Sequence, residues 1–376
     1  MSAKIKLNAT TGGGSVSIQA PSSESNDKVL SLPSDTDGTI VSKDSSNSLQ
    51  NVTGVNGGQL GNRNIIINGG MAVSQRNGTT ETTIANDTTT YSVDRFAIFD
   101  KIDGGNNFTY QQVTSPVPDG FSHALKINTA IADTSISAAN YAYFWQIVEG
   151  QNIQQANLGT SAAKPLTLSF HVYSNKTGTY TVGLVNQGTW NRTFLREFTI
   201  SSSATWEKKT VTFPAITDGT WNDVRVQWCL VAGTDNQGAA DTLLTSAELG
   251  TSNQVNFADV VNNAFFITGV QLELGSVTTD FEHRTFGQEL LLCQRYYAVA
   301  GVITATGTPE RYHNNISLPV DMRTSPTRSV GAIETGSGAT MAPNYEQGLA
   351  NSKRHFYQGS ANSAVSGAWF IFEAEL

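Results

Sequence analysis

Two tryptophans in turn-like segments are the residues of this sequence with the clearest binding chemistry. Trp190 stands in NQGTWNRT and Trp221 in TDGTWNDV, each followed by polar neighbours. A flat ring can stack on the C–H face of a sugar while amide, guanidinium or carboxylate groups bond its hydroxyls. The candidate glycan-binding residues are therefore Trp190, Asn191, Arg192, Trp221, Asn222 and Asp223. The alternative is that each ring folds over a sheet edge as part of the core.

Residues that could perform catalysis do not form a recognisable motif. The segment 120–124 (GFSHA) comes nearest to a hydrolase nucleophile turn, but it lacks the second glycine, which favours an ordinary surface turn. The histidines show no zinc-helix spacing. Glycoside hydrolysis needs two carboxylates about 5 to 9 Å apart, and no pairing is recognisable among Asp133, Glu149, Asp218, Asp223, Asp235 and Asp241. We therefore expect no enzymatic activity and no cofactor; a structural calcium ion is compatible with the chain, but the sequence selects no ligands for it.

The tryptophan turns lie among many short segments that alternate apolar and polar residues, which is typical of half-buried strands. Turn signals such as 175–178 and 218–219 separate these segments. Strands at this spacing without intervening helices predict a two-sheet sandwich, and we expect a jelly roll over residues 63–284. The predicted strands contain Ile65 and Ile67, Phe96 and Ile98, Phe108 and Tyr110, Tyr141 to Ile147, Leu166 to Val172, Tyr180 to Leu184, Val211 and Phe213, Val224 to Leu230, and a run ending at Leu274.

A helix is predicted directly after this sandwich, over residues 285–299. One side of it is lined by Phe286, Leu290, Cys293 and Tyr297, and other sides carry Leu291, Leu292 and Tyr296. A helix that is apolar nearly all round needs cover on more than one side. This pattern predicts a joint between two domains or a contact along an oligomer axis.

The last part of the chain, residues 300–376, reads as a small β-domain at the tip of the molecule. Strand-like runs cover 313–320, 328–333, 354–357 and 368–376, and the last of them turns Phe370, Phe372, Ala374 and Leu376 inward. An exposed distal end is useful for a receptor site. Further binding candidates at this tip are Tyr312, Tyr345, Tyr357 and Trp369.

Residues 1–62 are polar and rich in glycine and hold too few apolar side chains for a core of their own. Such a segment is either a disordered leader or gains a core from other copies of the chain, as in a trimeric fibre. We expect a fibrous, homotrimeric region here.

Composition limits the class of partner. The net charge of -8 and the absence of a basic stripe argue against nucleic-acid binding. No run approaches the ~18 apolar residues of a membrane span, and residues 1–14 lack the apolar centre of a signal peptide. Cys229 and Cys293 are predicted to be buried free thiols.

Several strings of the sequence resemble tail-fibre proteins of tailed bacteriophages, those of marine and cyanobacterial phages especially. They are NIIINGGMAVSQR, YSVDRF, SNKTGTYTVGL, WEKKTVTFP, GVQLELGSVTTDFEHRTFGQELLLCQRYY and SLPVDMRTSPT, and they span most of residues 61–327. None is a catalytic motif. The resemblance implies a virion protein, assembled in the host cytoplasm, whose N-terminal region attaches to tail or baseplate proteins and which adsorbs to host surface polysaccharide. A purely structural virion connector or decoration protein, and a polysaccharide depolymerase, are the alternatives.

Overall fold

A computed structural model describes residues 4–8, 15–19, 61–300, 310–333, 341–348, 354–361 and 368–375. The chain divides into two compact units, Met1–Val52 and Thr53–Leu376. In the first unit, β1 (Lys4–Asn8) and β2 (Ser15–Gln19) pair antiparallel. The predicted trimer of this region stays a prediction.

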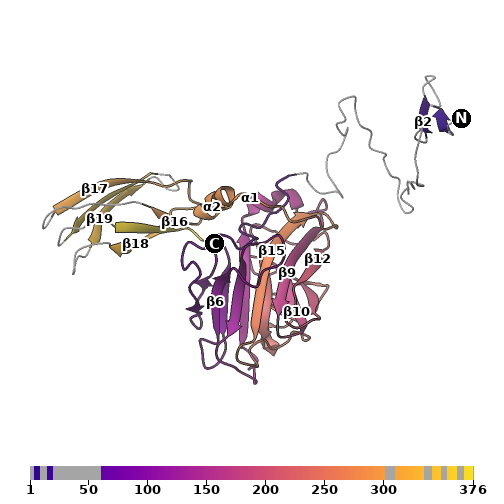
Figure 1. The fold of residues 1–376 in the computed structure, drawn as a ribbon, viewed down its shortest axis with the longest axis horizontal. Coiled ribbons are helices and arrows are strands. Elements are labelled where there is room, and N and C mark those ends of the chain that lie inside the picture. Colours follow the sequence, from indigo (N-terminus) through magenta and orange to yellow (C-terminus); the bar gives the residue numbers. More distant parts are fainter. Residues whose placement is uncertain are drawn as a thin grey trace. The chain divides into compact units, whose positions relative to one another are not determined.

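The second unit is built round a sandwich of two antiparallel sheets (Figure 1). One sheet has the order β14 (Leu243–Leu244), β11 (Thr193–Ile200), β10 (Gly178–Asn186), β13 (Val224–Ala232), β8 (Tyr141–Val148), β5 (Ala97–Lys101) and β4 (Thr90–Tyr91). The other has the order β12 (Glu207–Phe213), β9 (Leu166–Ser174), β15 (Ala264–Leu274), β7 (Ala124–Thr129), β6 (Phe108–Val113) and β3 (Thr82–Thr83). The predicted all-β, jelly-roll-like sandwich is therefore confirmed.

The core lies between the two sheets and follows the alternation of the strands. On β13, Val224, Val226 and Trp228 face this core and are fully buried. The Trp228 ring stacks on Phe144, with ring centroids 5.1 Å apart and an interplanar angle of 3°. The intervening β13 side chains consequently lie on the outer face of the seven-stranded sheet. Both cysteines are buried and free, as predicted.

Two features of the sandwich differ from the sequence prediction. The predicted strand at Ile65 and Ile67 is wrong, because local side-chain hydrogen bonds replace the sheet ladder there: Asn64 Oδ1 accepts the Ile66 N–H at 3.0 Å, and Asn68 adopts a left-handed φ of 59°. The strands β3, β4, β7, β11 and β14 were not predicted.

Helix α2 (Phe286–Gln294) begins where the sequence predicts and ends earlier. Thr285 caps it through a reciprocal capping box with Gln288. The expectation of a helix to residue 299 is wrong, because a turn closes after Cys293 and Tyr297–Ala300 forms β16, which pairs with β21 (Ala368–Glu373). Phe286 is 60% exposed, so the described residues leave part of the apolar surface of α2 uncovered.

The described residues of the C-terminal part form two three-stranded sheets, with orders β16-β21-β18 and β17-β20-β19. Their remaining strands are β17 (Glu310–Ser317), β18 (Thr327–Ile333), β19 (Met341–Gly348) and β20 (Arg354–Ala361). Phe370, Phe372 and Ala374 are buried, which confirms the predicted inward face, while Leu376 lies outside the described residues. Ion pairs from Arg95 and Arg76 to Glu375 connect this part to the sandwich. No helix in the described segments has the length and hydrophobicity of a membrane span.

Candidate functional site

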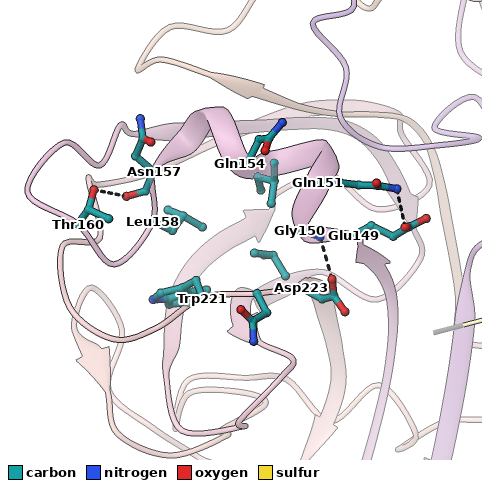
Figure 2. A pocket seen from close by; sticks show the side chains of 12 residues that line it. Glu149, Gly150, Gln151, Gln154, Asn157, Leu158, Thr160, Trp221 and Asp223 are labelled. Carbon is teal, nitrogen blue, oxygen red and sulfur yellow. Dashed lines mark hydrogen bonds between the residues drawn. The ribbon is translucent and has the colours of Figure 1, made fainter. Parts of the chain in front are cut away.

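A pocket of about 620 Å³ opens at one end of the sandwich, and we call it the Trp221 pocket. Figure 2 shows it between the segment of α1 (Gly150–Ile153) and η1 (Gln154–Ala156) and the turn that precedes β13. Amide, carboxylate and apolar side chains line it together with one indole ring. The lining residues are Glu149, Gly150, Gln151, Ile153, Gln154, Asn157, Leu158, Thr160, Trp221, Asn222, Asp223 and Val224.

Two glycines allow the walls of the pocket to approach each other. A Cβ at Gly150 would lie 2.5 Å from the Asn222 carbonyl oxygen, and the Gly150 N–H donates to Asp223 Oδ1 at 2.8 Å. A Cβ at Gly159 would lie 1.9 Å from the Gly219 oxygen, and the φ of Gly159 is +78°. Because only glycine fits at both positions, the sequence fixes the spacing of the two walls.

The indole of Trp221 is held in place without being enclosed. Its Nε1 donates to the Asp218 carbonyl oxygen at 3.0 Å, and the half-buried ring packs against the core together with Leu158. The rest of the ring lines the pocket. A ring oriented in this way costs little entropy to order when a ligand stacks on it.

Exposed amides stand round this ring and are available to a ligand. The side chains of Gln154 and Asn222 are exposed and make no hydrogen bond within the described part of the chain. Asn157 Nδ2 makes only a long bond, of 3.4 Å, to the Gln155 carbonyl oxygen. Each amide offers donors and an acceptor, which suits a hydroxyl-rich ligand.

Glu149 is the most constrained polar group of the pocket. Arg295 donates to both of its oxygens at 3.0 Å, Tyr296 Oη donates to Oε1, and Gln151 Nε2 donates to Oε2 at 2.7 Å. Burial opposes ionisation of this carboxyl, but the hydrogen bonds from Arg295 and Tyr296 and the charge of Arg295 outweigh it, so the pKa of Glu149 lies below its ordinary value. Glu149 is therefore a charged anchor between the pocket and the end of α2.

The second tryptophan turn lies beside the first but faces elsewhere. Asn186 Nδ2 donates to the Thr220 oxygen at 2.6 Å, and Arg192 Nε pairs with Asp218 Oδ2 at 3.0 Å, so the two turns are joined. Trp190 is 44% exposed and covers Arg225, whose guanidinium carbon is 4.2 Å from the ring centroid. The predicted residues Trp221, Asn222 and Asp223 line the pocket, whereas Trp190, Asn191 and Arg192 do not.

The sequence also suggested binding residues at the tip, a turn at GFSHA and a possible bound metal ion. The strands β17, β19, β20 and β21 carry the tip residues, but the side chains of Tyr312, Tyr345, Tyr357 and Trp369 lie outside the described residues. The GFSHA segment is a turn before β7, with the Ser122 Oγ and His123 Nδ1 atoms 2.8 Å apart. Within the described ranges, no group of three or more His, Cys, Asp or Glu side chains could hold a metal ion, and the possible calcium stays untested.

Sequence reasoning missed the wall formed by α1 and η1. The sequence feature that could have indicated this wall is the amide-rich run QNIQQAN at 151–157, which lies between two predicted strands. The wall lies next to Trp221 because β8 pairs with β13, and this pairing brings the end of β8 next to the start of β13.

No family model matches the chain, and no curated protein matches it. The chain is similar to the enzymatically active domain of tailspike protein 4 of bacteriophage CBA120, with 11% identity and a TM-score of 0.29, over 56% of this chain and 21% of that chain. It is also similar to TmCBM61 in complex with β-1,4-galactotriose, with 10% identity and a TM-score of 0.29, over 56% of this chain and 99% of that chain.

A third similar structure is the family 11 carbohydrate-binding module from Clostridium thermocellum in complex with a β-1,3-1,4-mixed-linked tetrasaccharide. It has 10% identity and a TM-score of 0.27, over 55% of this chain and 99% of that chain.

Proposed function

We propose that this chain is a virion tail-fibre protein of a tailed bacteriophage that adsorbs to polysaccharide on the host surface, and that the Trp221 pocket holds part of that polysaccharide. The observation that carries the proposal is the indole ring of Trp221 in a pocket rimmed by exposed amides. The sequence resemblance to phage tail fibres supports the virion role.

The chemistry of the pocket suits a neutral sugar. One face of a sugar ring stacks on the indole, and its hydroxyls bond to the amides of Gln154, Asn157 and Asn222. The volume of about 620 Å³ lies within the range of about 300 to 1,000 Å³ that is usual for small-ligand sites.

Binding without hydrolysis is the form of activity that we propose. A glycosidase needs one carboxylic acid whose pKa is raised so that it can protonate the leaving group. Glu149 lies at the pocket with a lowered pKa, and its oxygens are occupied by Arg295, Tyr296 and Gln151. New reducing ends after incubation with host polysaccharide would contradict this part of the proposal.

In a homotrimer, weak single sites would be sufficient for attachment to the host cell, because three sites on one fibre raise the effective concentration of the polysaccharide. In this proposal residues 1–62 attach to tail or baseplate proteins, and the tip residues add contacts to the host. The exposed Phe286 and Leu291 of α2 are available to a neighbouring subunit.

The test compares Trp221→Ala with Trp206→Ala. Trp206 is also half-buried, but it packs on Tyr173 and Phe266 away from the pocket, so it serves as a matched control. We expect Trp221→Ala to lose at least tenfold in affinity for host cells, with the melting temperature and the sedimentation coefficient of the assembly unchanged. Lost assembly with normal binding per subunit would instead favour a structural connector. If Trp221→Ala loses binding as expected, a glycan array probed with the wild type would identify the sugar.

A further inference from the structure

Arg225 on β13 is a buried cation on the outer face of the seven-stranded sheet, outside the Trp221 pocket. Its exposed fraction is 1%, and among the described residues it makes no ion pair. Arg95 is the natural comparison, because it is also buried, at 3%, and it pairs with the carboxylate of Glu375. Burial of an unpaired guanidinium costs several kcal/mol, so the absence of a carboxylate at Arg225 calls for an explanation.

Aromatic rings take the place of that carboxylate. The guanidinium carbon lies 4.2 Å from the Trp190 ring centroid, 5.1 Å from that of Tyr143 and 5.8 Å from that of Trp145. Nη1 donates to Tyr143 Oη at 3.2 Å, and Nε is buried without a hydrogen-bond partner among the described residues. Cation–π contacts of about 0.5 to 2 kcal/mol each offset part of the burial cost, but they leave the planar fork of donors open to an acceptor.

Trp190 is the most exposed of the three rings round Arg225. It stands in the β10–β11 turn with a left-handed φ of 54°, which is costly for a residue with a bulky side chain, and it is 44% exposed. On the other side of Arg225 the outer face continues through Tyr143 and Trp145, stacked at 4.6 Å, to the half-buried pair of Phe99 and Tyr141, stacked at 5.7 Å. An aromatic strip therefore runs over this face of the sheet, with one unpaired cation beneath its most exposed ring.

We propose that Trp190 moves off Arg225 and stacks on the ring of an acidic sugar residue, whose carboxylate then binds Arg225. The guanidinium fork matches a carboxylate through two parallel hydrogen bonds, and the low-polarity surroundings strengthen the pair. This inference rests on the proposed function and names its substrate class: a polysaccharide that contains uronic acids. The ion pair between Arg192 and Asp218 joins the Trp190 turn to the turn of the Trp221 pocket, so the two proposed sites lie on neighbouring turns.

The experiment titrates the full chain with tetragalacturonate and with a hyaluronan tetrasaccharide, each beside its methyl ester, by calorimetry. We expect at least one acid to bind at least tenfold more tightly than its ester. Arg225→Met should abolish this preference, whereas Arg196→Met should keep it, since Arg196 also lies over a ring, that of Phe194, but already pairs with Asp241. Arg225→Met should melt at the same or a higher temperature than the wild type, because it removes an unpaired buried charge.

Three results would overturn the inference: neither acid binds, the esters bind equally well, or Arg225→Met keeps the preference for the acid. Inorganic phosphate or sulfate that binds as tightly as the acidic sugars would show a general anion site and would also overturn it. Each of these results can occur while Trp221→Ala still reduces binding to host cells, in which case the proposed function stands without a preference for acidic sugars. Retained cell binding in Trp221→Ala would contradict the proposed function instead.

Discussion

Asp100 on β5 provides the sharpest test of the energetics of this sandwich. Its side chain is fully buried. Oδ2 accepts the N–H of Asn107 at 2.8 Å, but Oδ1 is buried and has no hydrogen-bond partner in the part of the chain that the structure describes. Burial disfavours the charged carboxylate, and the hydrogen bonds from Asn107 and Ile102 only partly oppose this, so the pKa of Asp100 rises from 3.8 to about 6.

The sign of the pH effect follows from that raised pKa. Between pH 3.8 and about 6 the folded state binds more protons at Asp100 than the unfolded state does. The contribution of this group to stability is therefore complete below pH 3.8 and is lost as the pH rises through about 6. At about 1.36 kcal/mol per pKa unit, the free energy of unfolding falls by about 3 kcal/mol across this window.

Asp100→Asn removes the titration and keeps an oxygen that can accept from Asn107. Urea unfolding of wild type and variant from pH 4 to pH 8 should show the stability of the variant, relative to wild type, rising by about 3 kcal/mol toward high pH. If the new amide changes the free energy of unfolding by the same amount at every pH, the pH dependence of the difference between variant and wild type stays the same. Asp103→Asn, at an exposed residue of the loop that follows β5, should not reproduce the rise, because hydrogen bonds from Ser137 and Asn140 lower the pKa of Asp103. A difference that is independent of pH, or one that grows toward acid, would refute the reasoning.

Two further predictions concern the walls of the Trp221 pocket. Glu149→Gln should lower the free energy of unfolding by about 2 kcal/mol in urea, because hydrogen bonds to a charged group contribute about 1.5 to 3 kcal/mol each; since the pKa of Glu149 is lowered, the deficit should shrink as the pH falls below its ordinary value of 4.5. Gly159→Ala should push Gly219 away and weaken sugar binding at least tenfold, as measured by calorimetry, at a cost of about 1 to 3 kcal/mol in stability. Gly120→Ala has a similar positive φ but nothing within 4 Å, and it should leave binding unchanged.

The fold could be predicted from the sequence as far as side-chain alternation determines it. The runs at Tyr141 and Val224 have a period of two and become β8 and β13. The run at Ile65 also alternates, yet it forms no strand, because the preceding Asn64 supplies the hydrogen bonds of a local turn. The end of α2 was not predictable either, since apolar periodicity continues through Tyr297 while the chain turns to pair with β21. Periodicity indicates which residues are buried, but it does not indicate which strand or helix covers them.

The residues of the candidate site could also be predicted only in part. Residue type and turn context were enough to select both Trp190 and Trp221, and the two turns do lie together. The different environments of the two rings could not be predicted, because they depend on strands far apart in sequence. The register of β13 places Arg225 opposite Ile147 of β8 and Val185 of β10, on the outer face and next to the Trp190 turn.

Arg225 and Arg95 are both buried arginines, but among the described residues only Arg95 has a carboxylate partner. Arg95 is equally buried, and there the C-terminal segment supplies Glu375, so the charge is neutralised within the protein. At Arg225 the chain places three rings round the guanidinium and supplies no acid from any described residue. If Arg225 served stability alone, an apolar residue of the same length would be the better choice, since removal of an unpaired charge is neutral or stabilising. The melting temperature of Arg225→Met therefore separates a structural role from a binding role before any ligand is added: a clear decrease would mean that the three rings already satisfy the cation.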